Sequence, residues 1–214
     1  TSYFPGGKGS ESGISNYSIN DIEPDEDGSY WIGGYNGLER FYPDKEIFIP
    51  IPLGGVNDVL DIMVDDNHIV WIATSQGLIK YHSNTNTLKR YTQLDGLTEE
   101  FIVSIVKDEL GMFWLGSRAG LIQFDSKHET FKVLSKDEGL TSNEFHRGSH
   151  LYSSEGLMYF GGPKGINIFD PLNMKGNVNK PTVIFTDLQV NKQPVPISEN
   201  GLLTQHISLT DSIS

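Results

Sequence analysis

WIGGYNGLERF, residues 31–41, indicates the architecture of the chain, because a similar pattern returns as WIATSQGLIKY at 71–81, WLGSRAGLIQF at 114–124 and YFGGPKGINIF at 159–169. The aromatic residues that lead these four segments are 40, 43 and 45 residues apart: Trp31, Trp71, Trp114 and Tyr159. Periods of about 40 to 50 residues made of short strands are typical of β-propeller blades. Helical repeats of this length would need apolar residues at a 3.6-residue spacing, which these segments lack.

Each repeat predicts four short strands. In the third repeat they are FIVSIVKD from Phe101, MFWLGS from Met112, LIQFD from Leu121 and TFKVL from Thr130. Polar turns separate the first two strands of a repeat: PDEDG at 24, VDDNH at 64 and KDELG at 107. The turn between the second and third strands ends on a glycine each time, which predicts a positive φ at Gly37, Gly77, Gly120 and Gly165.

The three tryptophans favour a packing role over a ligand-stacking role. Neighbouring strand residues point to opposite faces, so the pairs Trp-Ile and Trp-Leu place apolar groups on both faces of one strand. Propeller blades pack face to face and cover both faces. We therefore expect Trp31, Trp71 and Trp114 in the core between blades.

Composition narrows the function classes. The 214 residues are 37% hydrophobic, with a formal net charge of -12 and no cysteine. A negative chain with scattered Lys and Arg repels phosphate backbones, so nucleic acid is not an expected partner. No run of about 18 apolar residues and no signal-peptide pattern occurs, so we expect no membrane insertion by this chain. Disulfides and thiolate metal sites are excluded.

Three stretches carry a family resemblance: GLTSNEF at 139–145, the pattern D-x-x-G-x-x-W-I-G-x-x-x-G-L-x-x-F, and the last-repeat variant GLMYFGGPKGINIFDP. They resemble the two-component regulator propeller repeats. The resemblance implies the periplasmic sensor region of a hybrid two-component system, common in gut Bacteroides. In that family a β-sandwich, the three-tyrosine domain, follows the last blade, and KPTVIFTDLQVNKQPVPI from Lys180 resembles its start. Ala73 and the glycine-free turn DDNHIVW depart from the pattern.

The expected fold is all-β, a propeller fragment of about four four-stranded blades with the beginning of a C-terminal β-sandwich. We place the blades in residues 1–170, and a linker with the first sandwich strands in residues 171–214. Residues 1–5 fit an outer strand that completes the last blade, which shows three clear strands and no obvious fourth. Four blades closing alone is one arrangement; the other is a homodimer of two half-propellers, joined through open blade ends or the sandwich domain.

Catalytic and metal motifs are weak. PGGKGS at 5 lacks phosphate-loop spacing, and PDEDG lacks calcium-loop spacing. His146 and His150 are about 13 Å apart if they lie on one strand, too far to share an ion. We expect no cofactor, no metal and no enzymatic activity in this chain, with a carbohydrate-active propeller enzyme as the alternative.

Binding is better supported than catalysis. Turns between the second and third strands open on the same rim as the loops between blades, and repeat scaffolds vary where they bind. The varying residues are rich in amide, aromatic and guanidinium groups, which bind hydroxylated or carboxylated sugars. The candidate ligand-binding residues are Tyr35, Asn36, Gln76, Arg118, Asn143, Glu144, His146, Arg147 and Lys164. The simpler alternative is that they point into water.

The resemblance therefore implies a periplasmic sensing region that recognises an oligosaccharide or a related small ligand and signals to a kinase domain outside this chain. A structural propeller that holds two sensor chains together without a ligand is the rival reading. The residues alone do not identify the ligand.

Overall fold

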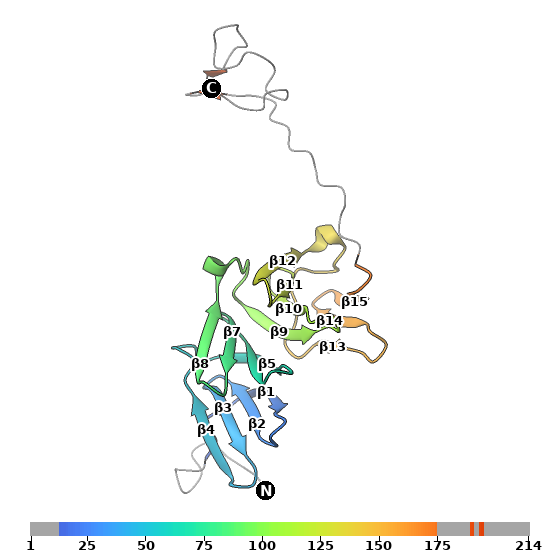
Figure 1. The fold of residues 1–214 in the computed structure, drawn as a ribbon. Helices are drawn as coiled ribbons and strands as arrows, with labels where there is room; N and C mark the ends of the chain where they lie inside the picture. The colour runs from blue at the N-terminus through green and yellow to red at the C-terminus, as the bar shows by residue number, and fades with distance from the viewer. Residues whose placement is uncertain (1–12, 175–188, 191–192, 195–214) are drawn as a thin grey trace. The chain divides into compact units, whose positions relative to one another are not determined.

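The computed structural model describes residues 13–174, 189–190 and 193–194, and the chain divides into two compact units, residues 1–174 and 175–214. In the first unit, antiparallel strands form successive sheets in chain order (Figure 1). The first sheet contains β1 (Ile19–Pro24), β2 (Tyr30–Gly34), β3 (Gly37–Tyr42) and β4 (Ile47–Ile51). The second contains β5 (Val59–Val64), β6 (Ile69–Thr74), β7 (Gly77–His82) and β8 (Thr87–Tyr91).

The third sheet contains β9 (Ile102–Lys107), β10 (Phe113–Ser117), β11 (Leu121–Asp125) and β12 (Thr130–Leu134). The fourth has three strands among the described residues: β13 (His150–Tyr152), β14 (Met158–Gly162) and β15 (Gly165–Phe169). The first strands contact one another in succession, β1 with β5, β5 with β9 and β9 with β13, so they form the inner edge of the blades. The all-β propeller fold and the four strands of the third repeat are thus confirmed.

The predicted turn geometry is also confirmed. Gly37, Gly77, Gly120 and Gly165 have φ values of 99°, 117°, 142° and 112°. The turn between the first and second strands also contains a glycine with positive φ in three repeats: Gly28, Gly111 and Gly156 have φ values of 83°, 80° and 78°. In the second repeat, which lacks that glycine, His68 takes the position at φ 57°. The hairpin therefore keeps its left-handed residue, although a side chain opposes that conformation.

The tryptophans lie between blades as predicted, at 0%, 1% and 0% exposure for Trp31, Trp71 and Trp114. Trp31 packs with residues of the second blade, including Val59 and Ile62. Trp71 packs in the same way with the third blade, and Trp114 with the fourth. Three hydrophobic clusters of the first unit are therefore interfaces between consecutive blades, and a further cluster of Ile14, Ile32 and Phe48 belongs to the first blade.

Each indole N–H also ends on a carboxylate of its own blade. Trp31 Nε1 donates to Asp25 at 3.0 Å, and Trp71 Nε1 donates to Asp65 at 3.0 Å. In the third blade, Trp114 donates to Asp108 at 2.9 Å, and the same carboxylate accepts two backbone N–H groups of the turn. The D-x-x-G-x-x-W pattern therefore encodes a hydrogen bond between its aspartate and its tryptophan. In the fourth repeat Ser153 and Tyr159 replace both partners together.

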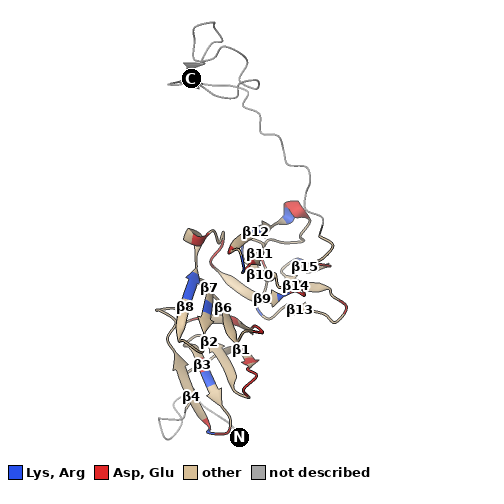
Figure 2. Ribbon diagram, viewed as in Figure 1, with Lys and Arg blue, Asp and Glu red and all other residues tan. Residues whose placement is uncertain are grey.

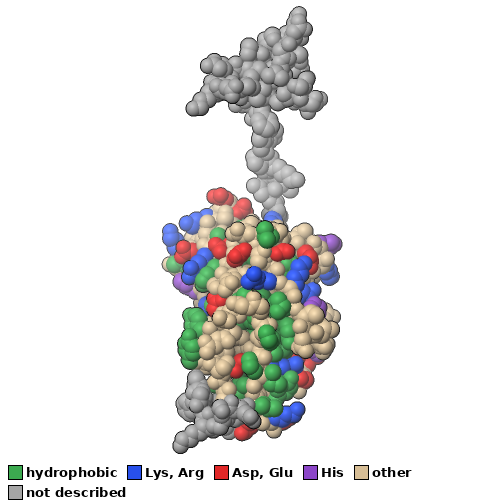
Figure 3. All heavy atoms as spheres, turned by 90° about the vertical axis from the view of Figure 1, so that its left-hand side faces the viewer, with side chains coloured by type: hydrophobic (Ala, Val, Ile, Leu, Met, Phe, Trp, Pro, Cys, Tyr) green, Lys and Arg blue, Asp and Glu red, His purple; other side chains and the backbone are tan. Residues whose placement is uncertain are grey.

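Apolar side chains remain exposed on both end blades. Ile22 on β1 and Ile166 and Ile168 on β15 are each about half exposed. Hydrophobic side chains also reach the surface among charged ones on the face shown in Figure 3.

The second unit is described only at a two-stranded hairpin, β16 (Gln189–Val190) with β17 (Gln193–Pro194). The rest of the predicted linker and sandwich lies outside the described residues, and so does the proposed outer strand at residues 1–5. Across the described part of the chain, no helix has the length and apolar character needed to cross a membrane.

Candidate functional site

One rim of the blades carries two adjoining clefts, built from the turns between second and third strands, from the loops between blades and from residues of the inner strands β5 and β9. The first cleft has a volume of about 530 Å³. It brings together five of the nine predicted residues, which come from the first, third and fourth repeats: Tyr35, Arg118, Glu144, His146 and Arg147. Its apolar lining is Leu60, Phe101, Val103 and Phe145. Residues more than 100 positions apart thus face one space.

The second cleft, of about 700 Å³, continues from the first because Arg118 and Glu144 line both. It holds two more predicted residues, Asn143 and Lys164, together with Lys136 and Ser142. The pair of clefts therefore forms one elongated surface, and Arg118 stands at the junction.

Arg147 links the fourth blade to the first across this rim. Its guanidinium donates to Asn20 Oδ1 at 2.6 Å and lies 3.4 Å from the Tyr35 hydroxyl. The Arg147 guanidinium carbon is also 5.9 Å from the centre of the Tyr35 ring. Tyr35 is half exposed, so its ring and the remaining guanidinium donors still face the cleft.

Arg118 lies over an aromatic ring. Its guanidinium carbon lies 3.7 Å from the centre of the Phe101 ring, which is cation–π geometry. A stacked guanidinium keeps its N–H groups at its edge, where a carboxylate or hydroxyl can accept two of them together. Arg118 is therefore oriented before any ligand arrives.

The loops that carry these residues are tied down by short capped helices. η1 (Gln93–Asp95) and η2 (Lys136–Glu138) each begin with a capping box, formed by Thr92 with Asp95 and by Ser135 with Glu138. Hydrogen bonds from the Ser135 backbone and hydroxyl hold the pKa of the Glu138 carboxyl below its usual range. Asn143 Oδ1 accepts the Lys136 N–H at 2.9 Å, which fastens the loop to η2.

Two predicted residues lie in neither cleft. Asn36 donates through its side-chain amide to the Ser15 carbonyl and through its backbone N–H to Asn16, so it fastens the segment before β1. Gln76 is exposed on its turn. Lys136 was missed by the sequence reasoning, although the repeated T/S-x-x-D/E wording before GLT at 92 and 135 marks its loop.

The two clefts are locally basic on an acidic chain. Four basic side chains line them, Arg118, Lys136, Arg147 and Lys164, against one carboxylate, Glu144. Elsewhere acidic and basic residues are interspersed along the described strands, and η2 itself carries both signs (Figure 2). An anionic group is therefore favoured here more than the net charge of -12 suggests.

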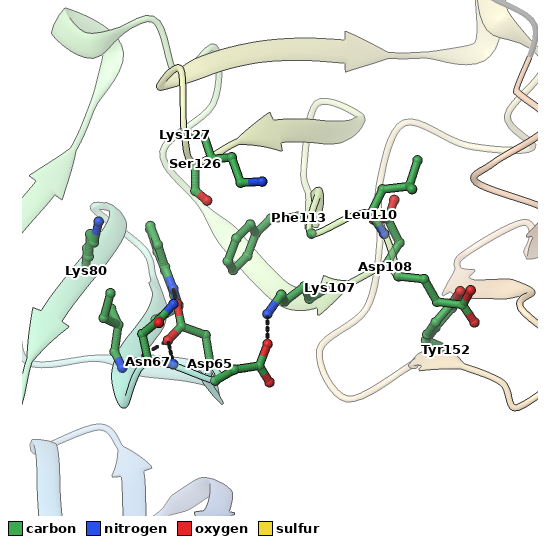
Figure 4. A pocket seen from close by; sticks show the side chains of 15 residues that line it. Asp65, Asn67, Lys80, Lys107, Asp108, Leu110, Phe113, Ser126, Lys127 and Tyr152 are labelled. Carbon is green, nitrogen blue, oxygen red and sulfur yellow. Dashed lines mark hydrogen bonds and ion pairs between the residues drawn. The ribbon is translucent and has the colours of Figure 1, made fainter.

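A third cleft, of about 670 Å³, opens between the second and third blades beside the turns that join first and second strands. Lys80, Lys107 and Lys127 surround the Phe113 side chain there (Figure 4). Lys107 is paired with Asp66 at 2.6 Å. The other acidic groups of the lining include Asp65 and Asp108, whose oxygens are engaged by indole and turn N–H groups. The sequence predicted these segments only as polar turns between first and second strands, and this cleft was not predicted.

Comparisons with known proteins agree on the kind of propeller. Residues 13–36 match the family model described as "Two component regulator propeller". The chain is 28% identical over 159 residues to histidine kinase P4 of Formosa agariphila, which covers 74% of this chain. The chain spans 8% of the length of that curated relative.

Two solved structures from B. thetaiotaomicron are similar, both extracellular domains of putative hybrid two component systems. One is 21% identical, with a TM-score of 0.69 over 89% of this chain and 28% of its own length. The other is 25% identical, with a TM-score of 0.61 over 74% of this chain and 22% of its own length. The chain thus carries a two component regulator propeller repeat in the fold of such extracellular domains, and it spans less than a third of either structure.

Proposed function

We propose that this chain is part of the periplasmic sensing region of a two-component regulatory protein, and that the two adjoining clefts bind an oligosaccharide. The observation that carries the proposal is the convergence of Tyr35, Arg118 and Arg147 on one cleft. The resemblance of the repeat to sensor propellers, together with the named histidine kinase relative, supports the sensing role. Signalling to a kinase elsewhere in the whole protein is part of the proposal.

The side chains of the clefts suit a sugar. Sugars present hydroxyl pairs and apolar ring faces, which planar guanidinium and amide groups and aromatic rings recognise. Arg118 supplies an oriented guanidinium edge, Tyr35 a half-exposed ring and Asn143 an amide. Because the clefts are continuous, the ligand has more than one sugar ring. Because four basic groups face one carboxylate, the favoured ligand carries carboxylate or sulfate groups.

Binding without cleavage is the proposed outcome. Most glycoside hydrolases place two carboxyl groups on either side of the bond, about 5 to 10 Å apart. Among the described residues that line the two clefts, Glu144 is the one carboxylate. A lone carboxylate can accept hydrogen bonds from sugar hydroxyls, but it does not supply both an acid and a base. The chain is therefore proposed as a sensor rather than a glycosidase.

Calorimetric titration of the 214-residue chain with matched neutral and uronic-acid-containing oligosaccharides tests the proposal. Arg118→Ala and Arg147→Ala should each weaken binding of the acidic ligand by about 10- to 150-fold, the loss of a charged hydrogen bond. Arg90→Ala is the matched control, because Arg90 is exposed on β8 and lines neither cleft. If both cleft substitutions leave the affinity for the acidic oligosaccharide unchanged, the ligand does not bind in these clefts.

The exposed apolar end blades support a second candidate, an assembly role. Ile22 on one end and Ile168 on the other are about half exposed, and blades bury such faces against each other. A homodimer through these faces would be seen by light scattering. Ile168→Glu should then shift the chain to monomer, whereas an unchanged mass would set this candidate aside.

A further inference from the structure

Acidic side chains on the inner strands connect neighbouring blades. Asp21 Oδ2 on β1 accepts the backbone N–H of Ile62 on β5 at 2.8 Å. Asp61 Oδ2 on β5 accepts the backbone N–H of Ile105 on β9 at 2.6 Å in the same manner. Both aspartates sit beside an irregularity in strand register, which turns the carboxylate toward the next blade. The two residues thus repeat one inter-blade contact.

His150 on β13 extends this contact to the fourth blade. Its Nε2 lies 3.4 Å from Asp61 Oδ2, and the two side chains are 20% and 8% exposed. The imidazole lies over Phe160, with ring centres 6.5 Å apart. Asp21, Asp61 and His150 therefore form a line of titratable groups that crosses from the first blade through the second to the fourth.

The hydrogen-bond pattern favours a neutral imidazole. His150 Nδ1 is buried and has no hydrogen-bond partner among the described residues. A proton on Nδ1 would be an unsatisfied buried donor, so the proton belongs on Nε2, where it faces Asp61. Burial accordingly lowers the pKa of His150, opposed by the charge of Asp21.

The carboxyl of Asp61 holds a proton near neutral pH. Burial, the Asp21 charge and a hydrogen bond with the Asp21 side chain raise its pKa to about 8, and the more distant Glu23 adds to this. The Ile105 N–H from β9 acts in the opposite direction. Groups facing Asp61 are thus Asp21 and Glu23 from β1, the Ile105 N–H from β9 and His150 from β13.

We propose that Asp21, Asp61 and His150 form a proton-linked clasp. One proton on Asp61 holds the inner strands of the first and second blades together, the imidazole N–H of His150 joins the fourth blade to Asp61, and the clasp so positions the cleft residues beside it. Removal of that proton leaves two adjacent carboxylates, which repel each other inside the protein. The strands β1 and β5 then lose part of their attraction, and the clasp loosens as pH rises.

The clasp lies directly beside the candidate binding cleft. Leu60, which lines the cleft, precedes Asp61, and Arg147 lies three residues before His150. Asn20, which precedes Asp21, accepts a hydrogen bond from the Arg147 guanidinium. Asp61 and His150 are therefore positioning residues for the cleft. The effect of the clasp on ligand binding rests on the proposed function, whereas the titration of the clasp does not.

Thermal unfolding of the 214-residue chain against pH tests the clasp without any ligand. Asp61 has a raised pKa in the folded state, so its stabilisation is complete below its unfolded pKa and is lost as pH rises toward about 8. His150 acts in the opposite sense below about pH 6.5, so the fall is measured from about pH 6.5 to about pH 8, where the difference between the wild type and Asp61→Asn reports the titration of Asp61. Across it, the Tm should fall by about 4 °C in the wild type.

Asp61→Asn should remove this fall, since an amide stays neutral and keeps an oxygen for the Ile105 N–H. Asp44→Asn, at an exposed turn, is the matched control and should retain the fall. An equal fall in wild type and Asp61→Asn overturns the clasp. If Asp61→Asn does not fold, the imidazole ¹⁵N shifts of His150 in the wild type decide: a change of tautomer or shift near about pH 8 supports the clasp, and its absence overturns it.

Amide hydrogen exchange of residues 143–149, compared at one alkaline pH, tests the effect on the cleft. The wild type should exchange faster than Asp61→Asn, because both proteins have the same intrinsic rate at that pH. If exchange is equal but the Tm still falls with pH only in the wild type, the positioning role is rejected and the clasp itself is supported. Loss of sugar affinity in Arg118→Ala is independent of both results, so failure of the proposed function is distinguished from failure of the clasp.

Discussion

Replacement of Trp71 by phenylalanine tests the hydrogen-bond unit that the repeat encodes. Phenylalanine keeps an aromatic ring in the core between the second and third blades but removes the indole N–H that Asp65 accepts at 3.0 Å. Trp71 is 1% exposed, so solvent does not replace the lost group from the tryptophan side. Asp65 is partly accessible, which lets water satisfy part of its carboxylate.

The expected loss combines two effects. A hydrogen bond to a charged group contributes about 1.5 to 3 kcal/mol, and partial hydration of Asp65 favours the lower end. The smaller ring leaves a void that costs about 1 kcal/mol. The sum of about 2.5 kcal/mol corresponds to a Tm lower by about 5 to 10 °C for a domain of this size.

Urea unfolding followed by circular dichroism measures this loss. The double mutant with Asp65→Ala separates the two effects, because the void remains while the hydrogen bond is already absent. Trp71→Phe should then cost about 1 kcal/mol in the Asp65→Ala background. A cost that is the same in both backgrounds would show that the hydrogen bond from the indole N–H to Asp65 contributes nothing to stability.

Three further changes have defined outcomes. Gly33→Ala should destabilise the fold by about 1 to 3 kcal/mol in thermal unfolding, because an added Cβ meets Val59 and lies 2.9 Å from Ile62 of the next blade; a neutral result would contradict the close packing. His68→Gly should stabilise by about 1 kcal/mol, since φ 57° strains a side chain, and a loss of stability would show that the His68 contacts outweigh the strain. Binding of a uronic-acid-containing oligosaccharide should weaken as salt rises from about 0.05 to about 0.5 M, whereas a neutral oligosaccharide should change little; parallel behaviour of the two would argue against the basic rim.

Much of the fold was predictable from the sequence because a repeat encodes local hydrogen bonds and packing several times over. The period, the alternation of apolar residues and the glycine turns identified the strands of the third blade. Gly37, Gly77, Gly120 and Gly165 showed their positive φ, and the tryptophans showed their place between blades. The sandwich segment and the N-terminal strand remain predictions.

The candidate binding surface was predictable only in part. Loop topology indicated the rim, and seven of the nine candidate residues line its two clefts, but Asn36 and Gln76 do not. Lys136 lines the second cleft because the capped helix η2 places it there, and this was not predicted from the sequence.

Tertiary structure alone decided which side chains from different blades meet. Arg147 reaches Asn20 over 127 residues of sequence, and His150 meets Asp61 from two blades away. Neither contact is reflected in the sequence repeat, because each depends on the rotation between successive blades and on how closely their inner strands approach. The repeat in the sequence specifies the blades and the variable loops of the rim. The rotation between blades, which depends on the packing of whole interfaces, brings together the residues of the clefts and the contact between Asp61 and His150.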